Sequence, residues 1–302
     1  MNIYNMSTNN KPLKIFCKIL YILVIIKLIF MFVNFSINTY CDDLFNKNNK
    51  YIEVDIKNYK DKKLDFNKIY NIKIIDSAKV IVKENKDCDE ILIKYYDSDD
   101  LKYNIDVKDD TLILENTNLK HKYKHLELNI LLPKKILKNI DINNKNGDVD
   151  IDFYKSEKVI IKNINGNANI KIDSNIFEIK NKNGNININN NSDDVKIKNT
   201  NGNINFSGNS NKIKIGNNNG NVYFNGVSND IKINNMNGKI NCDIKGNKDD
   251  YNINFKTVNG FTSINNIKID KNNKDLNINK NRNTNKNLNL KTFNGNIIIV
   301  FL

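Results

Sequence analysis

The dipeptide Asn-Gly returns at nearly constant spacing through the second half of the chain. Its glycines are separated by 19, 18, 18, 18, 18, 22 and 35 residues, and they stand at positions 147, 166, 184, 202, 220, 238, 260 and 295. A repeat of about twenty residues with alternating apolar positions is typical of a β-solenoid. The sequence therefore predicts an all-β fold, a parallel β-helix with two short strands in each coil of about 18 residues.

Two sets of apolar residues keep a fixed distance from these glycines. One set lies two and four residues after the glycine, and the other lies seven and five residues before it. For Gly202 the four residues are Ile204, Phe206, Val195 and Ile197. Because successive side chains in a strand point to opposite faces, both sets are expected to point into one thin core between two sheets.

The long interval before Gly295 hides a further copy, since Ile267/Ile269 and Leu276/Ile278 keep the same offsets around Asn273-Lys274. This gives nine coil starts in residues 133–302. Four buried apolar side chains contribute about 6 to 12 kcal/mol, whereas ordering the backbone of one coil costs on the order of 18 to 36 kcal/mol. Coils are therefore stable only when stacked, and the asparagine before each glycine is expected to form an amide ladder along the stack.

Residues 51–132 alternate less regularly and contain no glycine. Their short apolar runs are separated by polar, often acidic segments that suit hairpin turns. We expect an irregular all-β region that caps the solenoid, with a domain boundary near Pro133.

An apolar stretch over residues 19–37 follows Lys11, Lys14 and Lys18, and Asp42-Asp43 comes after it. Its length suits a transmembrane anchor, although a cleaved signal peptide has the same general pattern. We favour the anchor because no small-residue cleavage site precedes Asp42. The lysines place residues 1–18 in the cytoplasm, so that residues 38–50 form a linker and the remainder is extracytoplasmic, as in a single-pass protein of the cell membrane.

The segment Leu128-Asn-Ile-Leu-Leu-Pro133, followed by Ile136 to Ile142 and by Asn146-Gly147-Asp-Val149-Asp-Ile151, resembles the central signature of a bacterial family of cell-envelope proteins described as putative adhesins. In that family an alternating β segment leads through a Leu-Pro turn into repeated Asn-Gly or Ser-Gly coils. The resemblance covers residues 51–302. It implies a β-solenoid ectodomain, often anchored in a membrane, without an established enzymatic activity and without catalytic residues to carry over.

Lysines recur on the outward side of one predicted strand. Lys196, Lys214 and Lys232 fall in line, flanked by Lys162, Lys180, Lys198, Lys256, Lys268 and Lys291. Stacked in register, such charges repel one another unless an anionic partner or counter-ions relieve them. The partner could be an anionic cell-surface polymer or glycan, and the alternative is a solvated face that prevents aggregation. Nucleic acid is a weaker candidate, because only Tyr223 and Tyr251 offer aromatic side chains nearby.

The other predicted strand carries outward asparagines, among them Asn185, Asn187, Asn203 and Asn205. A flat array of amides suits carbohydrate binding through repeated hydrogen bonds. The alternative is that the amides bond to one another.

No catalytic, cofactor or metal site is expected. His121 and His125 are the two histidines of the chain, and an i, i+4 pair in a strand lies about 13 Å apart, too far for one metal ion. Cys242 falls on an inward position, where a thiol behaves as a small hydrophobic group. Outward acids such as Asp148, Asp150 and Asp152 do not form the converging row that a polysaccharide-cleaving enzyme needs.

The last residues, Ile297 to Leu302, are all apolar and are expected to form the terminal edge strand. An apolar edge needs a cover. Residues 271–287 could fold over it, or it could be an interface for self-association or a protein partner. The sequence thus favours a non-enzymatic, adhesin-like binding module for anionic or glycan ligands, and the alternative is a structural or signalling ectodomain that contacts another membrane protein.

Overall fold

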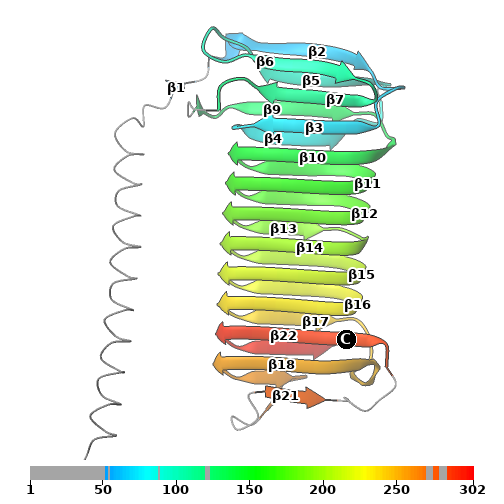
Figure 1. Cartoon of the computed structure of the whole chain (residues 1–302), viewed down its shortest axis with the longest axis vertical. Coiled ribbons are helices and arrows are strands. Elements are labelled where there is room, and N and C mark those ends of the chain that lie inside the picture. The colour runs from blue at the N-terminus through cyan, green and yellow to red at the C-terminus, as the bar shows by residue number, and fades with distance from the viewer. Residues whose placement is uncertain (1–51, 54, 88, 120–122, 270–274, 279–283) are drawn as a thin grey trace, which may run out of the picture. The chain divides into compact units, whose positions relative to one another are not determined.

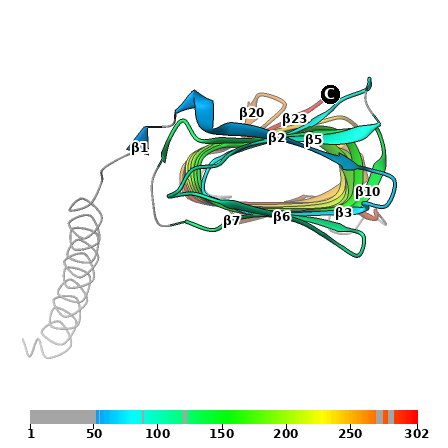
Figure 2. The same ribbon diagram turned by 90° about the horizontal axis from the view of Figure 1, so that it is seen from above.

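The computed structural model describes residues 52–53, 55–87, 89–119, 123–269, 275–278 and 284–302. They belong to one compact unit that spans Tyr51–Leu302. Two flat sheets, here called A and B, face each other and join at both edges into a flattened tube (Figure 2). Among the described residues, no helix has the length and apolar character needed to cross a membrane. The predicted anchor at residues 19–37 lies outside them.

The strands before residue 133 have at most seven residues each. They are β1 (Ile52–Glu53), β2 (Tyr59–Asp65), β3 (Asn71–Asp76), β4 (Lys79–Glu84), β5 (Glu90–Tyr96), β6 (Tyr103–Lys108), β7 (Thr111–Asn116), β8 (Tyr123–Lys124) and β9 (Glu127–Leu132). A 3-10 turn, η1 (Ile56–Asn58), precedes β2, and a second one, η2 (Lys248–Asp250), lies far downstream.

Most strands of the repeats are longer. They are β10 (Ile136–Asn146), β11 (Val149–Asn165), β12 (Ala168–Asn183), β13 (Ile186–Asn189), β14 (Ser192–Asn201), β15 (Ile204–Asn219), β16 (Val222–Asn237) and β17 (Ile240–Ile244). Four of them, β11, β12, β15 and β16, run from sheet B around one edge into sheet A as single strands of 16 or 17 residues. The two short strands predicted for each of these coils are therefore one continuous strand.

The C-terminal strands are β18 (Tyr251–Asn259), β19 (Thr262–Ile264), β20 (Ile267–Lys268), β21 (Asp275–Ile278), β22 (Lys286–Asn294) and β23 (Ile297–Phe301). All stacked neighbours within the solenoid pair in parallel. Along sheet A, the front sheet in Figure 1, the order is β7, β3, β10, β11, β12, β14, β15, β16, β22, β18. Along sheet B it is β9, β4, β11, β12, β13, β15, β16, β17, β23, β19.

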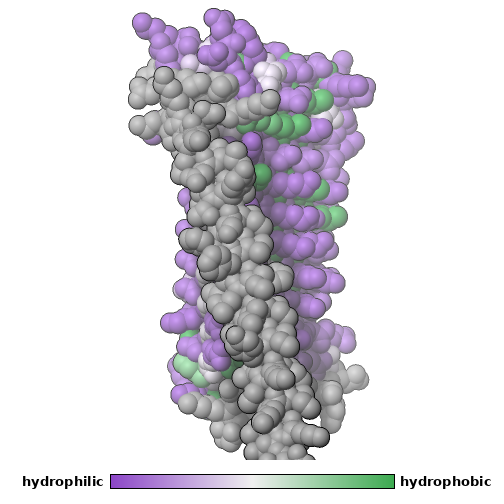
Figure 3. Space-filling model, turned by 60° about the vertical axis from the view of Figure 1, so that its left-hand side comes forward, coloured by the Kyte–Doolittle hydropathy of each residue, from purple (hydrophilic) through white to green (hydrophobic). Residues whose placement is uncertain are grey.

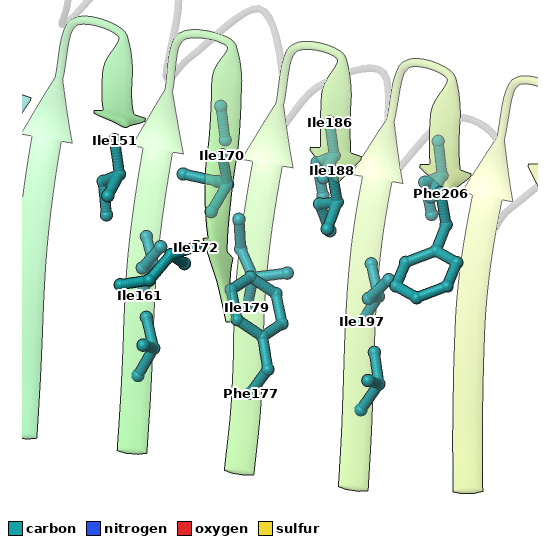
Figure 4. Packing of buried hydrophobic residues seen from close by; sticks show 14 of the residues in the cluster. Ile151, Ile161, Ile170, Ile172, Phe177, Ile179, Ile186, Ile188, Ile197 and Phe206 are labelled. Atoms are coloured by element: carbon teal, nitrogen blue, oxygen red, sulfur yellow. The ribbon is translucent and has the colours of Figure 1, made fainter. Parts of the chain in front are cut away.

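The predicted inward residues form the core. In the coil of Gly202, Val195, Ile197 and Ile204 are fully buried and Phe206 nearly so. Side chains from the two sheets point toward one another in the narrow space between them (Figure 4). Identical positions stack along the axis, and the rings of Phe206 and Phe224 lie parallel with their centroids 5.7 Å apart. The inward pattern predicted from the glycine offsets is confirmed.

The solenoid begins before the predicted boundary at residue 133. Strands β3 and β4 stack in parallel on β10 and β11, and β7 and β9 stack in parallel on β3 and β4. In this region the antiparallel pairings are those of β6 on β7, of β5 on β9, and of β2 on β5. The cap is thus smaller than predicted, because short strands without glycine turns still follow the register of the repeats.

The C-terminal end departs further from the prediction. Strand β23 lies between β17 and β19, and β22 lies between β16 and β18. The last strand is therefore not an edge strand, and the prediction that residues 297–302 form the terminal edge of the stack is wrong. The prediction that Ile267 to Ile278 form a further coil of the repeat is also wrong. Strands β20 and β21 pair antiparallel with β19 and β18 and cover that end of the stack.

The turn between sheets A and B falls at each Asn-Gly. Gly202 has a φ of 125°, and a Cβ at this position would lie 2.2 Å from the carbonyl oxygen of Gly184 in the coil above. Only glycine fits such a stack. The asparagines before the glycines form the predicted amide ladder, for example from Asn201 Nδ2 to Asn183 Oδ1 at 2.8 Å. The exposed side of this edge is mostly hydrophilic where described residues are visible (Figure 3).

Candidate ligand-binding surface

The outer side of sheet A carries the predicted lysines. Alternation in β14, β15 and β16 turns Lys196, Lys214 and Lys232 outward, and the backbone register places Lys196 opposite Lys214 and Lys214 opposite Lys232. A second row lies two residues further along each strand. We call the outward side chains of these two rows, in the strands of sheet A from β11 to β18, the lysine face, and its lysines are Lys162, Lys180, Lys196, Lys198, Lys214, Lys232, Lys256 and Lys291.

One carboxylate interrupts this face. Glu178 lies opposite Lys196, and its side chain contacts the ammonium groups of Lys180 at 2.8 Å and Lys196 at 4.0 Å. The hydrogen bond from Lys180 and the nearby lysine charges hold the pKa of Glu178 below its usual value. Within the part of the chain that the structure describes, Lys214 and Lys232 form no ion pair, so positive charge is least compensated in β15 and β16.

Lys268 does not belong to this face. It lies in β20 at the end of sheet B, where its Nζ stands 5.0 Å from the centre of the Phe261 ring. Its predicted place among the flanking lysines is wrong, because it depended on the hidden copy.

A groove of about 750 Å³ crosses the lysine face near its C-terminal end. Gly216 stands in the second row between Lys198 and Asn234, where the other strands carry a side chain. Lysines border the groove on one side, and three apolar side chains, Met236, Phe293 and Val258, border it on the other.

The predicted asparagine candidates are largely engaged within the protein. The side-chain oxygens of Asn185 and Asn203 accept hydrogen bonds from the backbone N–H groups of the next coil, at 2.8 Å in both cases. Asn205 donates to Asn187 at 2.7 Å, and Asn187 donates to Asn169 at 2.8 Å. The alternative foreseen for these residues, amides that bond to one another, is the arrangement that the structure has for Asn187 and Asn205.

A shallow groove of about 780 Å³ follows the outer side of sheet B between its two rows of outward side chains. Its lining includes Asn187, Asn205 and Tyr223, and it mixes acids such as Asp243 with lysines such as Lys171. This surface is close to neutral, in contrast to the lysine face.

The sequence analysis missed a buried polar column that runs through ten coils. In eight of these coils it occupies the position three residues before the glycine of the Asn-Gly turn, and its side chains are at most 5% exposed. Asn199 donates to Gly184 O at 3.0 Å, and Thr257 and Thr292 donate in the same way to Gly295 O and Gly238 O. The signal in the sequence was the asparagine or threonine that recurs at this offset. In axial order the members are Asn116, Asp76, Asn144, Asn163, Asn181, Asn199, Asn217, Asn235, Thr292 and Thr257.

Asp76 is the charged member of the column. Its carboxylate accepts hydrogen bonds from Tyr103 Oη at 2.7 Å, Asn116 Nδ2 at 2.9 Å and the N–H of Ser77 at 2.7 Å. Burial raises the pKa of Asp76, although these donors oppose the shift. Burial and the Asp76 charge also raise the pKa of the Tyr103 hydroxyl well above its usual value. Asp76 and Asn116 are buried and the cluster joins the N-terminal coils, so we regard it as structural.

The described residues contain no group of three or more histidine, cysteine, aspartate or glutamate side chains that could hold a metal ion. His125 is described and His121 is not. Cys242 is fully buried on its inward position, and burial raises the pKa of its thiol.

A family model of Toastrack DUF4097 matches residues 69–300, which is most of the solenoid. The chain belongs to the Toastrack family. The Toastrack match begins just before β3, in agreement with the early start of the coils. No curated protein matches the chain.

Several solved structures resemble this Toastrack chain. A putative adhesin from Bacteroides fragilis shares 14% identity over 82% of this chain and 99% of its own, with a TM-score of 0.48. A putative adhesin from Parabacteroides merdae shares 14% identity over 83% and 99%, with a TM-score of 0.47. A putative cell adhesion protein from Clostridium sporogenes shares 14% identity over 81% and 99%, with a TM-score of 0.26. None of these likenesses identifies a ligand for this chain.

Proposed function

We propose that this Toastrack protein is a non-enzymatic, adhesin-like module that binds an anionic polymer along the lysine face. Residues 19–37 would anchor it in the membrane and display the solenoid outside the cell. The observation that carries the proposal is the in-register row of Lys196, Lys214 and Lys232, of which only Lys196 has a carboxylate partner among the described residues.

The row is electrostatically unfavourable without a partner. Strands in a sheet are about 4.8 Å apart, and two unit charges at such a distance repel by about 1 kcal/mol even in water. The long lysine side chains can diverge, which reduces this cost. An extended polyanion gains most from the arrangement, because its own charges are also spaced along a line and it replaces many counter-ions at once.

The outward acids support a binding role over catalysis. Asp148 accepts a hydrogen bond from the N–H of Asn167, Asp150 accepts from Asn169, and Asp152 forms an ion pair with Lys171. These carboxylates are spread along sheet B and are bound to neighbours. They do not face each other across a cleft, as the paired acids of a glycosidase do.

The test compares two triple variants of the full chain, each held on a surface through its N-terminus. One variant changes Lys196, Lys214 and Lys232 to Gln, and the control changes Lys171, Lys239 and Lys245 to Gln, which alters the net charge equally but leaves the lysine face intact. Near an anionic surface each lysine contributes about 1 kcal/mol, so the first variant should bind polyphosphate on the order of 100-fold more weakly.

Binding should also weaken as salt is raised, and the control should stay close to the unchanged protein. Equal losses in both variants would mean that net charge alone attracts the polymer. No binding by the unchanged protein would contradict the proposal and favour the alternative, an ectodomain that contacts another membrane protein.

A further inference from the structure

Gly216 has no structural reason to be a glycine. It lies inside β15, it does not have a positive φ, and a Cβ built on it would meet no atom within 4 Å. Glycine weakens the interior of a strand, and where no bulge or turn needs it, it often marks a place where another molecule approaches the backbone closely. The neighbouring coils carry Lys198 and Asn234 at the same position.

The missing side chain makes a hollow in the lysine face. Lys198 and Lys214 stand beside it, and Lys291 and Lys256 continue the same border toward β18. Within the described part of the chain, Lys198, Lys214 and Lys291 form no ion pair. The hollow therefore offers several ammonium groups to an anionic substituent.

The opposite border of the hollow is apolar. Met236, Phe293 and Val258 lie at successive levels of β16, β22 and β18 and are 55%, 53% and 37% exposed. Three large apolar side chains on neighbouring strands of an outer sheet face are unusual for a solvated surface and mark an interaction site.

We infer that the hollow at Gly216 binds one ring of an acidic polysaccharide. The ring would lay its C–H face on the backbone at Gly216 and against Phe293 and Met236, while its carboxylate or sulfate pairs with Lys198, Lys214 or Lys291. Thr200, Asn218 and Asn234 line the same groove and suit the hydroxyl groups of a sugar. This inference depends on the proposed function, because it names the ligand of the same face.

The lining favours a sugar over a lipid chain. An acyl chain would remove water from the amide and hydroxyl groups of Thr200, Asn218 and Asn234 without offering them hydrogen bonds, which is costly. The apolar border is also half exposed, so it offers a surface to one face of a ring and does not enclose a chain.

The test fills the hollow without disturbing the fold. In Gly216→Phe the new Cβ meets open space, and phenylalanine is favoured in strands. Ser207→Phe adds the same side chain to the outer side of sheet B and is the matched control. We expect Gly216→Phe to weaken binding of an alginate hexamer at least 10-fold, with Ser207→Phe within about twofold of the unchanged chain and neither variant melting at a lower temperature than the unchanged chain.

Polyphosphate, which has no rings, separates this inference from the proposed function. Its binding should depend on Lys196, Lys214 and Lys232 and should change less than about threefold in Gly216→Phe. Two results would overturn the inference and leave the proposed function standing. In the first, the chain binds polyphosphate but not alginate; in the second, it binds both, and Gly216→Phe does not weaken alginate binding.

A second variant guards against an indirect effect of the new ring. Phe293→Ala removes part of the apolar border from an exposed position, and we expect it to weaken alginate binding at least fivefold with polyphosphate binding retained. Vesicles of phosphatidylglycerol serve as the lipid probe. If Gly216→Phe weakens vesicle binding and not alginate binding, the groove is a lipid site and the inference is wrong.

Discussion

The buried asparagines of the polar column donate hydrogen bonds to the turn of the preceding coil. Asn181 Nδ2 lies 3.3 Å from Gly184 O in its own coil and 3.2 Å from Gly166 O in the neighbouring coil. Its side-chain oxygen accepts no hydrogen bond from the described residues. The position thus needs a donor and makes little use of the acceptor, which explains why threonine takes the same place in the coils of Gly260 and Gly295.

Changing Asn199 separates these two roles. Asn199→Ala removes the donor to Gly184 O and should lower the free energy of unfolding by about 1 to 2 kcal/mol. Asn199→Thr keeps a hydroxyl donor and should lose less than half of that amount. Urea unfolding followed by circular dichroism measures both, and equal losses in the two variants would show that the hydrogen bond is not the cause.

Asp76 should make stability depend on pH. Its pKa is raised in the folded protein, so the folded state holds this proton more tightly than the unfolded chain does. Stability is then highest below the unfolded value and falls as the pH rises through the interval from there to the folded pKa. The ordinary value is 3.8, so we expect the loss to begin near this pH.

Asp76→Asn lacks this titration but can still accept hydrogen bonds from Tyr103 and Asn116. The difference in unfolding free energy between the unchanged protein and Asp76→Asn should change with pH above 3.8. It should become constant once Asp76 is ionised in both the folded and the unfolded chain. A difference that is flat across this interval would show that Asp76 does not titrate abnormally.

At the scale of the element, Gly216 of β15 and Gly202 in the turn that precedes this strand have opposite roles. Gly202 at the turn has a positive φ, and a Cβ added there would collide with backbone atoms of the preceding coil, whereas neither is true of Gly216 within the strand. Gly202→Ala should therefore lower the unfolding free energy by more than about 2 kcal/mol, from backbone strain and collision together.

Gly216→Val should do the reverse and raise the unfolding free energy by about 0.5 to 1 kcal/mol, because glycine in a strand loses more conformational freedom on folding. Thermal unfolding of the two single variants provides the comparison. If both substitutions destabilise the protein to the same extent, the hollow at Gly216 has a structural purpose after all.

Local periodicity predicted the elements of the repeats but not their order at the ends. The offsets around each glycine predicted the inward residues, the amide ladder and the in-register lysines, because each coil makes the same contacts with its neighbours as the coil before it. The position of β22 and β23 depends on pairing between segments far apart in the sequence, which no local pattern reports. The same limit applies to Gly216, whose position in the sequence was plain but whose open surroundings were not.

At the scale of the whole unit, the solenoid closes both ends with antiparallel strands. Edge strands invite pairing with other chains, and β2, β6, β20 and β21 cover the ends of the parallel stack. Strand β23 is deep within that arrangement: the N–H of Ile297 donates to Phe261 O and Asn296 O accepts from the N–H of Ile240, both at 2.9 Å.

Hydrogen exchange tests this placement. The amides of β23 should exchange as slowly as those of β17, and much more slowly than those of β20 at the covered end, because β23 has partners on both sides. Rapid exchange throughout β23 would indicate that the last strand lies at an edge, as its position in the sequence first suggested.

The insertion of β22 and β23 has a consequence for biosynthesis. Coils β10 to β17 can stack one after another as the nascent chain leaves the ribosome, because each needs only the coil made before it. Strands β18 and β19 emerge next, but their parallel partners β22 and β23 are not available until residues 286–301 have been made. A chain interrupted before that point would leave the ends of sheets A and B, at β16 and β17, without their parallel partners. We expect such fragments to be degraded or to aggregate.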